Sequence, residues 1–346
     1  MTVGIKEVAR KANVSIATVS RVLNGSDSVT EKTKQRVMAV VGELNYMPHA
    51  IGRALVTHRT NLLGVILPDV HSEFFSELIR GIDHAARERS YHIMVSSTHS
   101  NKKEIESMLA VMQGGHVDGM IVMSPHISAD GVLKRLAPTS KLVFVNSYTN
   151  GKGFVSVSID NFNGAFQMIR HLVVAHGHKR IAIIKGEESN FDARERFNGY
   201  VEALKKYGLR RVPELEISGN FTEESGYEGM MKILKLKTKP SALFCANDSM
   251  ALGALMAMHE KDIIVPGEIA LAGFDDIPSA RYVLPALTSV HVPIYEMGTI
   301  AVQYLLNGIK AMDGTKGIKK VLATSVVIRE SCGCSLKSKE EVSETA

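Results

Sequence analysis

The first part of the chain repeats apolar residues with the spacing of short amphipathic helices. Apolar positions recur every three or four residues over 5–12, resume over 19–23 and continue over 37–44. Ser15 is placed to cap the second helix, Asn24-Gly25 to end it, and Thr30 to open the third. The pattern predicts a helix-turn-helix with a supporting helix, whose expected buried side chains are Ile5, Val8, Ala9, Ala12, Val19, Val22, Leu23, Val37, Val40, Val41 and Leu44.

From residue 61 the pattern changes to short apolar runs separated by helical stretches, such as "LLGVILP", "HIMVSS", "GMIVMS", "LVFVN", "RIAIIK", "SALFCA" and "IALAGF". Such alternation is typical of parallel sheets covered on both faces, so the fold class is α/β. The runs form two series that meet near residue 160, and the later "TSVHVPIYEMGTIAVQYLL" and "ATSVVIRES" indicate that the chain crosses back. We expect two lobes, with a ligand cleft at the carboxyl ends of their strands.

Length and composition agree with a folded protein of several domains. The chain has 346 residues, whereas single cores rarely grow past roughly 250–300 residues. Its apolar fraction of 45% and charged fraction of 22% are those of a water-soluble protein. No apolar run approaches the roughly 18 residues that span a bilayer, and "MTVGIKEVARK" is charged where a signal peptide would be apolar. We therefore expect a cytoplasmic protein with no membrane partner.

The positive charge is concentrated at one end of the chain. Residues 1–60 hold nine Lys and Arg against four acidic residues, a balance of +5. The whole chain has 41 basic and 36 acidic residues, also +5, so residues 61–346 are neutral overall. A basic head on a neutral body is typical of a module that binds a polyanion.

The second predicted helix, in "VSIATVSRVLNG", has an outer face suited to DNA. Small apolar groups such as Ile16 and Ala17 suit thymine methyls in the major groove, Arg21 suits guanine, and hydroxyls suit phosphates. The alternative is a small helical bundle whose exposed face has no function. The side chains left outward by burial of the apolar face are Ser15, Ile16, Ala17, Thr18 and Arg21.

Two longer stretches, "IKEVARKANVSIATVSRVLNG" and "VTEKTKQRVMAVVGELNYMPHAIGRAL", resemble the DNA-binding head of the LacI/GalR family of bacterial transcription regulators. The resemblance adds Asn24 and Arg53 to the expected DNA contacts. It also implies a hinge helix in "PHAIGRAL" that forms on the operator and wedges Leu55 into the minor groove. Gly52 and Val56 depart from the family pattern, so we expect the hinge helix to depend more strongly on DNA and on dimer contacts.

The body resembles the periplasmic-binding-protein-like effector domain of the same family. The matching segments are "PDVHSEFFSELIRGI", "VDGMIV", "HGHKRIAII", "FDARERFNGYVEAL", "CANDSMALGAL" and "LAGFDDIPSARYVLPALTSV". With the head, the resemblance covers residues 4–331. The expected domains are a helix-turn-helix head (1–47), a hinge and linker (48–60), an effector-binding and dimerisation body (61–330) and a polar tail (331–346). Within the body we expect a first lobe of about 61–160 with 289–320 and a second of about 161–288 with 321–330.

The resemblance also assigns effector-binding positions. Arg196 matches the family's ligand-binding arginine, Asp275 its carboxylate and Phe221 its aromatic residue, and Asn247 is similarly placed. A guanidinium and a carboxylate can bind adjacent hydroxyls while an aromatic ring covers the apolar face of a sugar or base. Taken singly, such residues are more often surface ion pairs or core. Further candidates for the cleft are Phe74, Phe75, Asp192 and Asn146.

Neither a metal nor a cofactor is expected. Asp275 and Asp276 are adjacent, so on extended backbone they point to opposite sides. The histidines of "HLVVAHGH" (His171, His176 and His178) are explained by the dipole at a helix end. The three cysteines, Cys245, Cys332 and Cys334, match neither a disulfide framework nor paired zinc spacing.

We expect a regulator rather than an enzyme, because the chain has no GxxxxGK[ST], GxGxxG after a strand, HExxH or GxSxG motif. The expected function is repression of carbohydrate-utilisation genes by a homodimer on a pseudopalindromic operator, with a small carbohydrate or related metabolite in the cleft as effector. The alternative is a global regulator of the catabolite-control type, switched by a phosphorylated partner protein. The tail "SLKSKEEVSETA" has no leucine heptads, so we expect dimers rather than tetramers.

Overall fold

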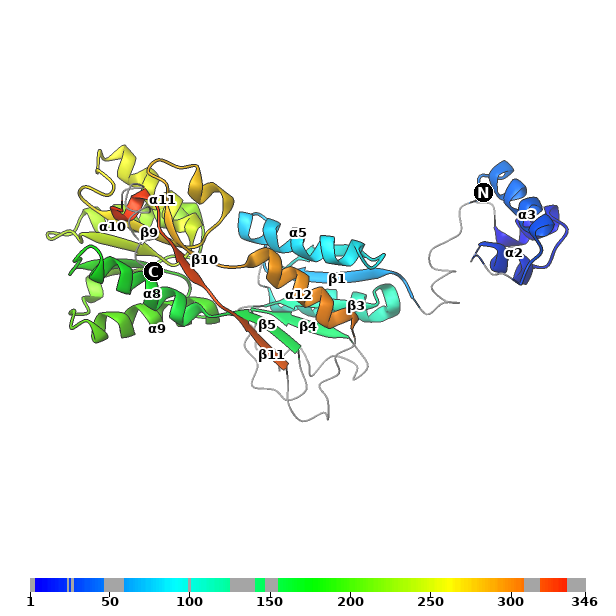
Figure 1. Cartoon of the computed structure of the whole chain (residues 1–346), viewed down its shortest axis with the longest axis horizontal. Helices are drawn as coiled ribbons and strands as arrows, with labels where there is room; N and C mark the ends of the chain where they lie inside the picture. The colour runs from blue at the N-terminus through cyan, green and yellow to red at the C-terminus, as the bar shows by residue number, and fades with distance from the viewer. Residues whose placement is uncertain are drawn as a thin grey trace, which may run out of the picture. The chain divides into compact units, whose positions relative to one another are not determined.

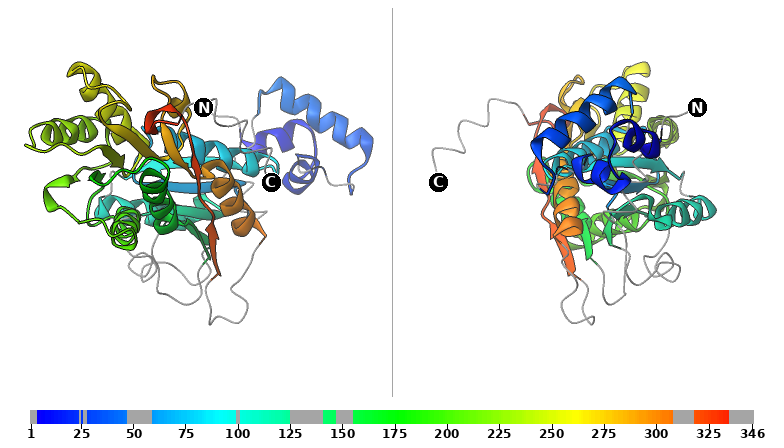
Figure 2. Two further views of the ribbon diagram at one scale, coloured as in Figure 1. Left: turned by 60° about the vertical axis from the view of Figure 1, so that its left-hand side comes forward. Right: turned by 90° about the vertical axis from the view of Figure 1, so that its right-hand side faces the viewer.

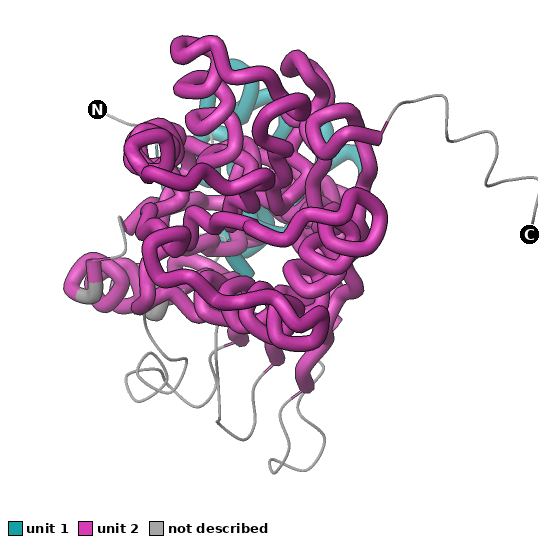
Figure 3. Tube along the Cα trace, turned by 90° about the vertical axis from the view of Figure 1, so that its left-hand side faces the viewer, with its two compact units in different colours: residues 1–60 teal, residues 61–346 magenta. Residues whose placement is uncertain are grey.

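The computed structural model describes residues 4–23, 25, 28–46, 59–98, 101–124, 141–146, 155–307 and 318–334. The chain divides into two compact units, residues 1–60 and 61–346 (Figure 3). The boundary at residue 60 coincides with the change from helical to α/β sequence pattern.

The first unit contains the three expected helices, α1 (Ile5–Lys11), α2 (Ile16–Leu23) and α3 (Glu31–Glu43). The Thr18 amide donates to Ser15 Oγ over 3.0 Å, so Ser15 caps α2 as the sequence predicts. Gly25 has a φ of +70°, a conformation that glycine adopts without strain and that ends helices. The core of this unit consists of Val8, Ala9, Ala12, Val19, Val22, Val37, Val40 and Tyr46, with Ile5, Leu23, Val41 and Leu44 partly buried around it.

The second unit contains two six-stranded sheets. The first has the order β11-β5-β4-β3-β1-β2 and all its strand pairs are parallel. Its strands are β1 (Leu62–Leu67), β2 (His92–Ser97), β3 (Gly119–Met123), β4 (Leu142–Val145), β5 (Val155–Ile159) and β11 (Ile318–Leu322). Its helices are α5 (Glu73–Arg87), α6 (Lys102–Val111), which continues into a π-helical turn at Met112–His116, and α12 (Ile294–Leu306).

The second sheet has the order β12-β10-β9-β8-β6-β7 and is parallel except at β12, which runs antiparallel to β10. Its strands are β6 (Ile181–Lys185), β7 (Glu216–Ser218), β8 (Ala242–Cys245), β9 (Ala270–Asp275), β10 (Thr288–His291) and β12 (Ser325–Val327). Its helices are α8 (Asn161–Val174), α9 (Phe191–Lys206), α10 (Glu223–Leu234) and α11 (Asp248–Glu260), with short 3₁₀ helices η2 (Pro213–Leu215), η3 (Pro278–Arg281) and η4 (Glu330–Cys332).

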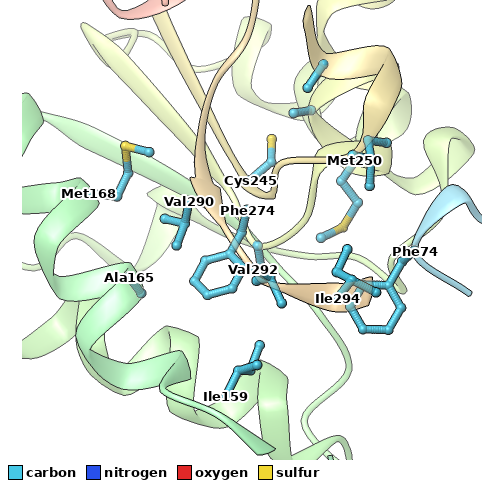
Figure 4. Packing of buried hydrophobic residues seen from close by; sticks show 14 of the residues in the cluster. Phe74, Ile159, Ala165, Met168, Cys245, Met250, Phe274, Val290, Val292 and Ile294 are labelled. Carbon is cyan, nitrogen blue, oxygen red and sulfur yellow. The ribbon is translucent and has the colours of Figure 1, made fainter. Parts of the chain in front are cut away.

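The central strands are buried along almost their whole length because helices cover both faces of each sheet (Figures 1 and 2). The helices pack in pairs, α5 with α12, α8 with α9 and α10 with α11. One apolar cluster spans both sheets and includes the segment from Val290 to Ile294 that crosses between them. Figure 4 shows this region, where Phe274 lies beside Val292 and Ile294 lies beside Phe74.

Among the described strands, the chain passes between the two sheets three times, after β5, after β10 and after β11. The first crossing lies at residues 159–161, near the predicted residue 160. The other two lie slightly later than the sequence indicated, because β10 runs to His291 within the second sheet and β11 runs to Leu322 within the first. The ends of β10 and β11 are set by hydrogen bonds to neighbouring strands, and the local sequence pattern does not show where those bonds stop.

Candidate DNA-binding helix and effector cleft

Helix α2 presents an exposed N-terminal face. Ile16 is 45% exposed, whereas Val19, one turn later, is fully buried. Ala17 and Arg21 are also exposed. The Ser15 hydroxyl lies 2.9 Å from the Thr18 hydroxyl and accepts from the Thr18 amide, so this pair shapes the start of the helix. The face therefore offers apolar groups and a guanidinium, which is the chemistry that reads base edges in a major groove.

The remaining expected DNA contacts, Asn24, Arg53 and Leu55, lie outside the described residues. Gly52 and Val56, on which the hinge prediction depends, also lie outside them.

A cleft of about 560 Å³ lies where the carboxyl ends of strands from both sheets meet. This volume is within the range of about 300–1,000 Å³ that is usual for small-molecule sites. The first lobe contributes the segment after β1 and the end of β3, and the second lobe contributes the segments after β6, β7, β8 and β9. Seven of the eight predicted effector-binding residues line this cleft: Phe74, Phe75, Asp192, Arg196, Phe221, Asn247 and Asp275.

The eighth candidate, Asn146, does not line the cleft. It follows β4 with a φ of +43° and is 1% exposed. Its amide nitrogen and oxygen are both buried without a hydrogen-bond partner among the described residues. Asn146 is therefore a buried polar side chain outside the cleft lining, so its predicted place among the ligand-binding residues is not borne out by this structure.

Arg196 on α9 is the centre of a buried polar network. Its Nε donates to Asn161 Oδ1 over 2.8 Å, one terminal nitrogen donates to the Ala246 carbonyl over 2.6 Å, and the other lies 3.1 Å from Asp275 Oδ1. The guanidinium also lies over the Phe274 ring, 3.8 Å from its centre. The side chain is 5% exposed, so its position is fixed by these contacts before any ligand arrives.

Asn161 joins this arginine to the second carboxylate of the cleft. Its Nδ2 donates to Asp192 Oδ1 over 2.8 Å while its Oδ1 accepts from Arg196. Asn161 lies at the start of α8, and sequence reasoning missed it because nothing local connects it to residues some thirty positions later.

Burial controls the ionisation of both acidic groups in the cleft. It raises the pKa of Asp192 and of Asp275 to about 6, although Arg196 acts in the opposite direction on both. The two carboxylates therefore lose much of their charge in mildly acidic solution. A ligand hydroxyl that donates to Asp275 would favour the ionised form.

Asp275 and its neighbour Asp276 have different surroundings, although the extended backbone that the sequence argument assumed is absent, since their φ angles are +113° and +57°. Asp275 faces Arg196 and the cleft, whereas Asp276 accepts from Arg329 over 2.5 Å and lies 2.9 Å from His291 Nδ1. Burial alone would raise the pKa of Asp276, but these two partners outweigh it and lower the pKa. The adjacent pair is therefore not a paired-carboxylate site.

The aromatic residue Phe221 is held in an unusual conformation. Its φ is +70°, its carbonyl accepts from Asn247 Nδ2 over 3.0 Å, and its ring lies against Gly186. A Cβ on Gly186 would be 2.3 Å from the ring, so only glycine leaves room for the ring in this position. Asn247 also caps α11 by accepting from the Met250 amide over 2.9 Å. Its side chain therefore positions Phe221 and the helix as well as lining the cleft.

The two lobes are joined by a hydrogen-bonded contact beside the cleft. Glu73, at the start of α5, accepts from the Ser279 amide over 2.9 Å and from the Ser279 hydroxyl. The next residues, Phe74 and Phe75, meet edge to face with ring centres 5.5 Å apart. Sequence reasoning missed Glu73, and it also missed further polar residues of the cleft that follow strands: Asp69, Ser72, Glu187, Asn190, Asn220 and Thr222.

No helix within the described residues is long and apolar enough to cross a membrane.

The fold defines a class of protein: a helix-turn-helix module joined to a two-lobed body with a cleft between its sheets. Comparison with known proteins agrees. Residues 4–49 match bacterial regulatory proteins of the lacI family, and residues 169–332 match the periplasmic binding protein-like domain. The chain belongs to the lacI family and is a DNA-binding transcriptional regulator.

Similar proteins support this assignment over nearly the whole chain. Catabolite control protein A of Priestia megaterium is 35% identical over 88% of this chain and 92% of its own. A structure titled as the transcriptional regulator CelR–cellobiose complex is 30% identical, covering 95% and 99% of the two chains with a TM-score of 0.71. A lac repressor dimer bound to operator and the anti-inducer ONPF is 26% identical, covering 96% and 99% with a TM-score of 0.85.

Proposed function

We propose that this protein is a repressor of carbohydrate-utilisation genes that binds a pseudopalindromic operator as a dimer. A small carbohydrate or related metabolite in the cleft between the lobes changes its affinity for that operator.

The arrangement of Arg196 and Asp275 is the observation that carries the effector assignment. A cationic donor and an anionic acceptor lie 3.1 Å apart, both line the cleft, and both are almost fully buried. Such a pair can bind two neighbouring hydroxyls of one sugar, since the guanidinium donates and the carboxylate accepts. The Phe221 ring at the same cleft covers an apolar sugar face. The relative CelR, whose structure is titled as a cellobiose complex, supports the class of ligand.

The operator assignment follows from helix α2. The N-terminal residues of such a helix contact bases in one major groove, and a two-fold dimer presents two helices to half-sites about one helical turn apart. Selection of bound fragments from a random duplex library tests this symmetry. The expected result is a two-fold symmetric consensus, whereas a single unpaired half-site would exclude the dimeric mode.

A ligand panel tests the effector. Thermal unfolding of the full chain is measured with sugars, sugar phosphates, sugar acids and nucleobases. A ligand at about 100 times its Kd adds about 2.7 kcal/mol, which raises the midpoint by a few degrees. We expect a sugar or a sugar derivative to produce this shift. Asp275→Asn should abolish it and Phe221→Leu should reduce it, whereas Arg87→Gln, which removes an exposed ion pair with Asp83 on α5, should leave it unchanged.

The similarity to catabolite control protein A favours a second candidate, in which a phosphorylated protein partner is the switch. The same panel separates the two. No shift with any compound would exclude the cleft ligand and favour the protein partner.

A further inference from the structure

Two histidines and two cysteines meet at one end of the second lobe. His171 lies in the last turn of α8 and His176 just beyond it, while Cys332 ends η4 and Cys334 follows. The ligand atoms of all four lie within 4.8 Å of one another. Individual distances are 3.4 Å from His171 Nε2 to Cys332 Sγ, 3.2 Å from His176 Nε2 to Cys334 Sγ, and 4.0 Å from His171 Nε2 to Cys334 Sγ.

We propose that His171, His176, Cys332 and Cys334 bind one Zn²⁺ ion. With the usual zinc bond lengths, a nitrogen and a sulfur on the same tetrahedral ion are about 3.6 Å apart. The three nitrogen–sulfur distances in the cluster lie on both sides of that value. Two thiolates and two imidazoles select a borderline-soft transition metal over calcium or magnesium, which prefer oxygen ligands.

The residue before the cysteines anchors their segment to β9 and to the residues before β10. Ser331, directly before Cys332, donates through its hydroxyl to the Leu271 carbonyl over 2.6 Å and through its amide to the Ala286 carbonyl over 3.0 Å. Gly333 has a φ of +102°, which turns the chain so that both flanking thiols face the histidines. A side chain there would be strained by this φ, and a Cβ would already touch the His176 ring at 3.4 Å.

A neutral imidazole has a lone pair that can bind a zinc ion. One ring nitrogen of His171 and one of His176 each lie beside a thiol sulfur, so both are placed to share a metal ion with the cysteines. His178 is outside the ligand set, because it is not among the four residues whose ligand atoms lie within 4.8 Å of one another; its Nδ1 lies 3.0 Å from Ser241 Oγ.

The ion would join parts of the chain that are far apart in sequence. His171 and His176 belong to the segment after the first crossing, and the cysteines come after the third crossing, 156 to 163 positions later. A four-ligand closed site of this kind has a structural role, since no coordination position is left for a substrate. Zinc loading would therefore hold the final segment of the second lobe on α8.

Cobalt and zinc binding by the full chain test the site. The protein is treated with chelator and reductant, and is then titrated with Zn²⁺ or Co²⁺. We expect about one ion per chain, with the intense visible bands of tetrahedral Co²⁺ and a thiolate-to-cobalt charge-transfer band. Zn²⁺ should displace the cobalt and raise the unfolding midpoint.

Four variants complete the test. Cys334→Ser and His176→Gln should lose the stoichiometric ion, whereas His178→Gln and Cys245→Ala, a nearby histidine and a buried thiol outside the set, should retain it. The assignment is overturned if the wild-type cobalt spectrum is octahedral or lacks the thiolate band, or if zinc content is equal in all variants. A Cys332–Cys334 disulfide found by mass spectrometry in freshly purified protein would also overturn it.

Discussion

The ionisation of Asp275 predicts a measurable dependence of stability on pH. The carboxyl group is 5% exposed, and burial raises its pKa from 3.8 to about 6. The folded protein therefore binds a proton that the unfolded chain has lost over this interval. The contribution of this proton to the free energy of unfolding is fully present below pH 3.8. It is lost as the pH rises to about 6 and is absent at higher pH. A difference of about 2 pH units corresponds to about 3 kcal/mol.

Asp275→Asn isolates this contribution. Asparagine keeps an oxygen beside Arg196 but cannot ionise, so it removes the cost of the buried charge and weakens one charge-assisted contact. The free energy of unfolding is measured in urea by far-UV circular dichroism at several pH values from 4 to 7. We expect the stability of the variant relative to wild type to increase with pH, by up to about 3 kcal/mol over this range.

The neighbouring Asp276 provides a control of opposite sign. Its pKa is lowered, so its stabilising contribution is present above its unfolded value and is lost as the pH falls. Asp276→Asn should therefore become less stable relative to wild type as the pH rises towards 3.8, and the difference should be nearly constant from pH 4 to 7. A pH-independent difference for Asp275→Asn, or the same rise from pH 4 to 7 for both variants, would refute the argument.

Three further predictions concern the DNA-binding helix, the cleft and the contact between lobes. Arg21→Ala should cost about 1–3 kcal/mol on the selected operator and relax one base position; equal loss on scrambled DNA in fluorescence anisotropy would remove Arg21 from base reading. Gly186→Ala should displace the Phe221 ring and weaken the effector about tenfold in calorimetry, and the added Phe221→Leu should give no further loss if the ring is the cause. Glu73→Ala should speed hydrogen exchange at the Ser279 amide about ten- to hundredfold, because a charge-assisted hydrogen bond of about 1.5–3 kcal/mol is lost; unchanged exchange would show that the contact does not protect this amide.

Local features explain why the head was predictable from the sequence. The spacing of Val8, Val19 and Val37 places them in one core, and the Ser15 hydroxyl caps α2 by accepting from an amide only three residues later. The two sheets follow equally from continuous apolar strands, since burial on both faces leaves a clear pattern. The rule that ligands bind at the carboxyl ends of strands, together with the family resemblance, placed Arg196, Phe221 and Asp275 in one cleft.

Contacts between distant segments could not be predicted in this way. Asn161 connects Asp192 to Arg196 only after α8 and α9 have packed together. Asn146 follows a strand, as a cleft residue should, yet its side chain is buried away from the cleft lining. In the sequence the histidines and the cysteines form two separate groups, and neither group alone has the spacing of a zinc site. The third crossing of the chain brings them together.

The measurement that tests the central claim most directly is operator affinity of the full-length protein with and without its effector. Labelled DNA from the selection is titrated by fluorescence anisotropy in the presence of the compound that stabilises the protein most. We predict a change in Kd of about tenfold or more in wild type, which corresponds to at least about 1.4 kcal/mol of coupling between the two sites. In Asp275→Asn the change should disappear, while operator affinity without effector stays the same. An effector that stabilises the protein but leaves its operator affinity unchanged would contradict the account.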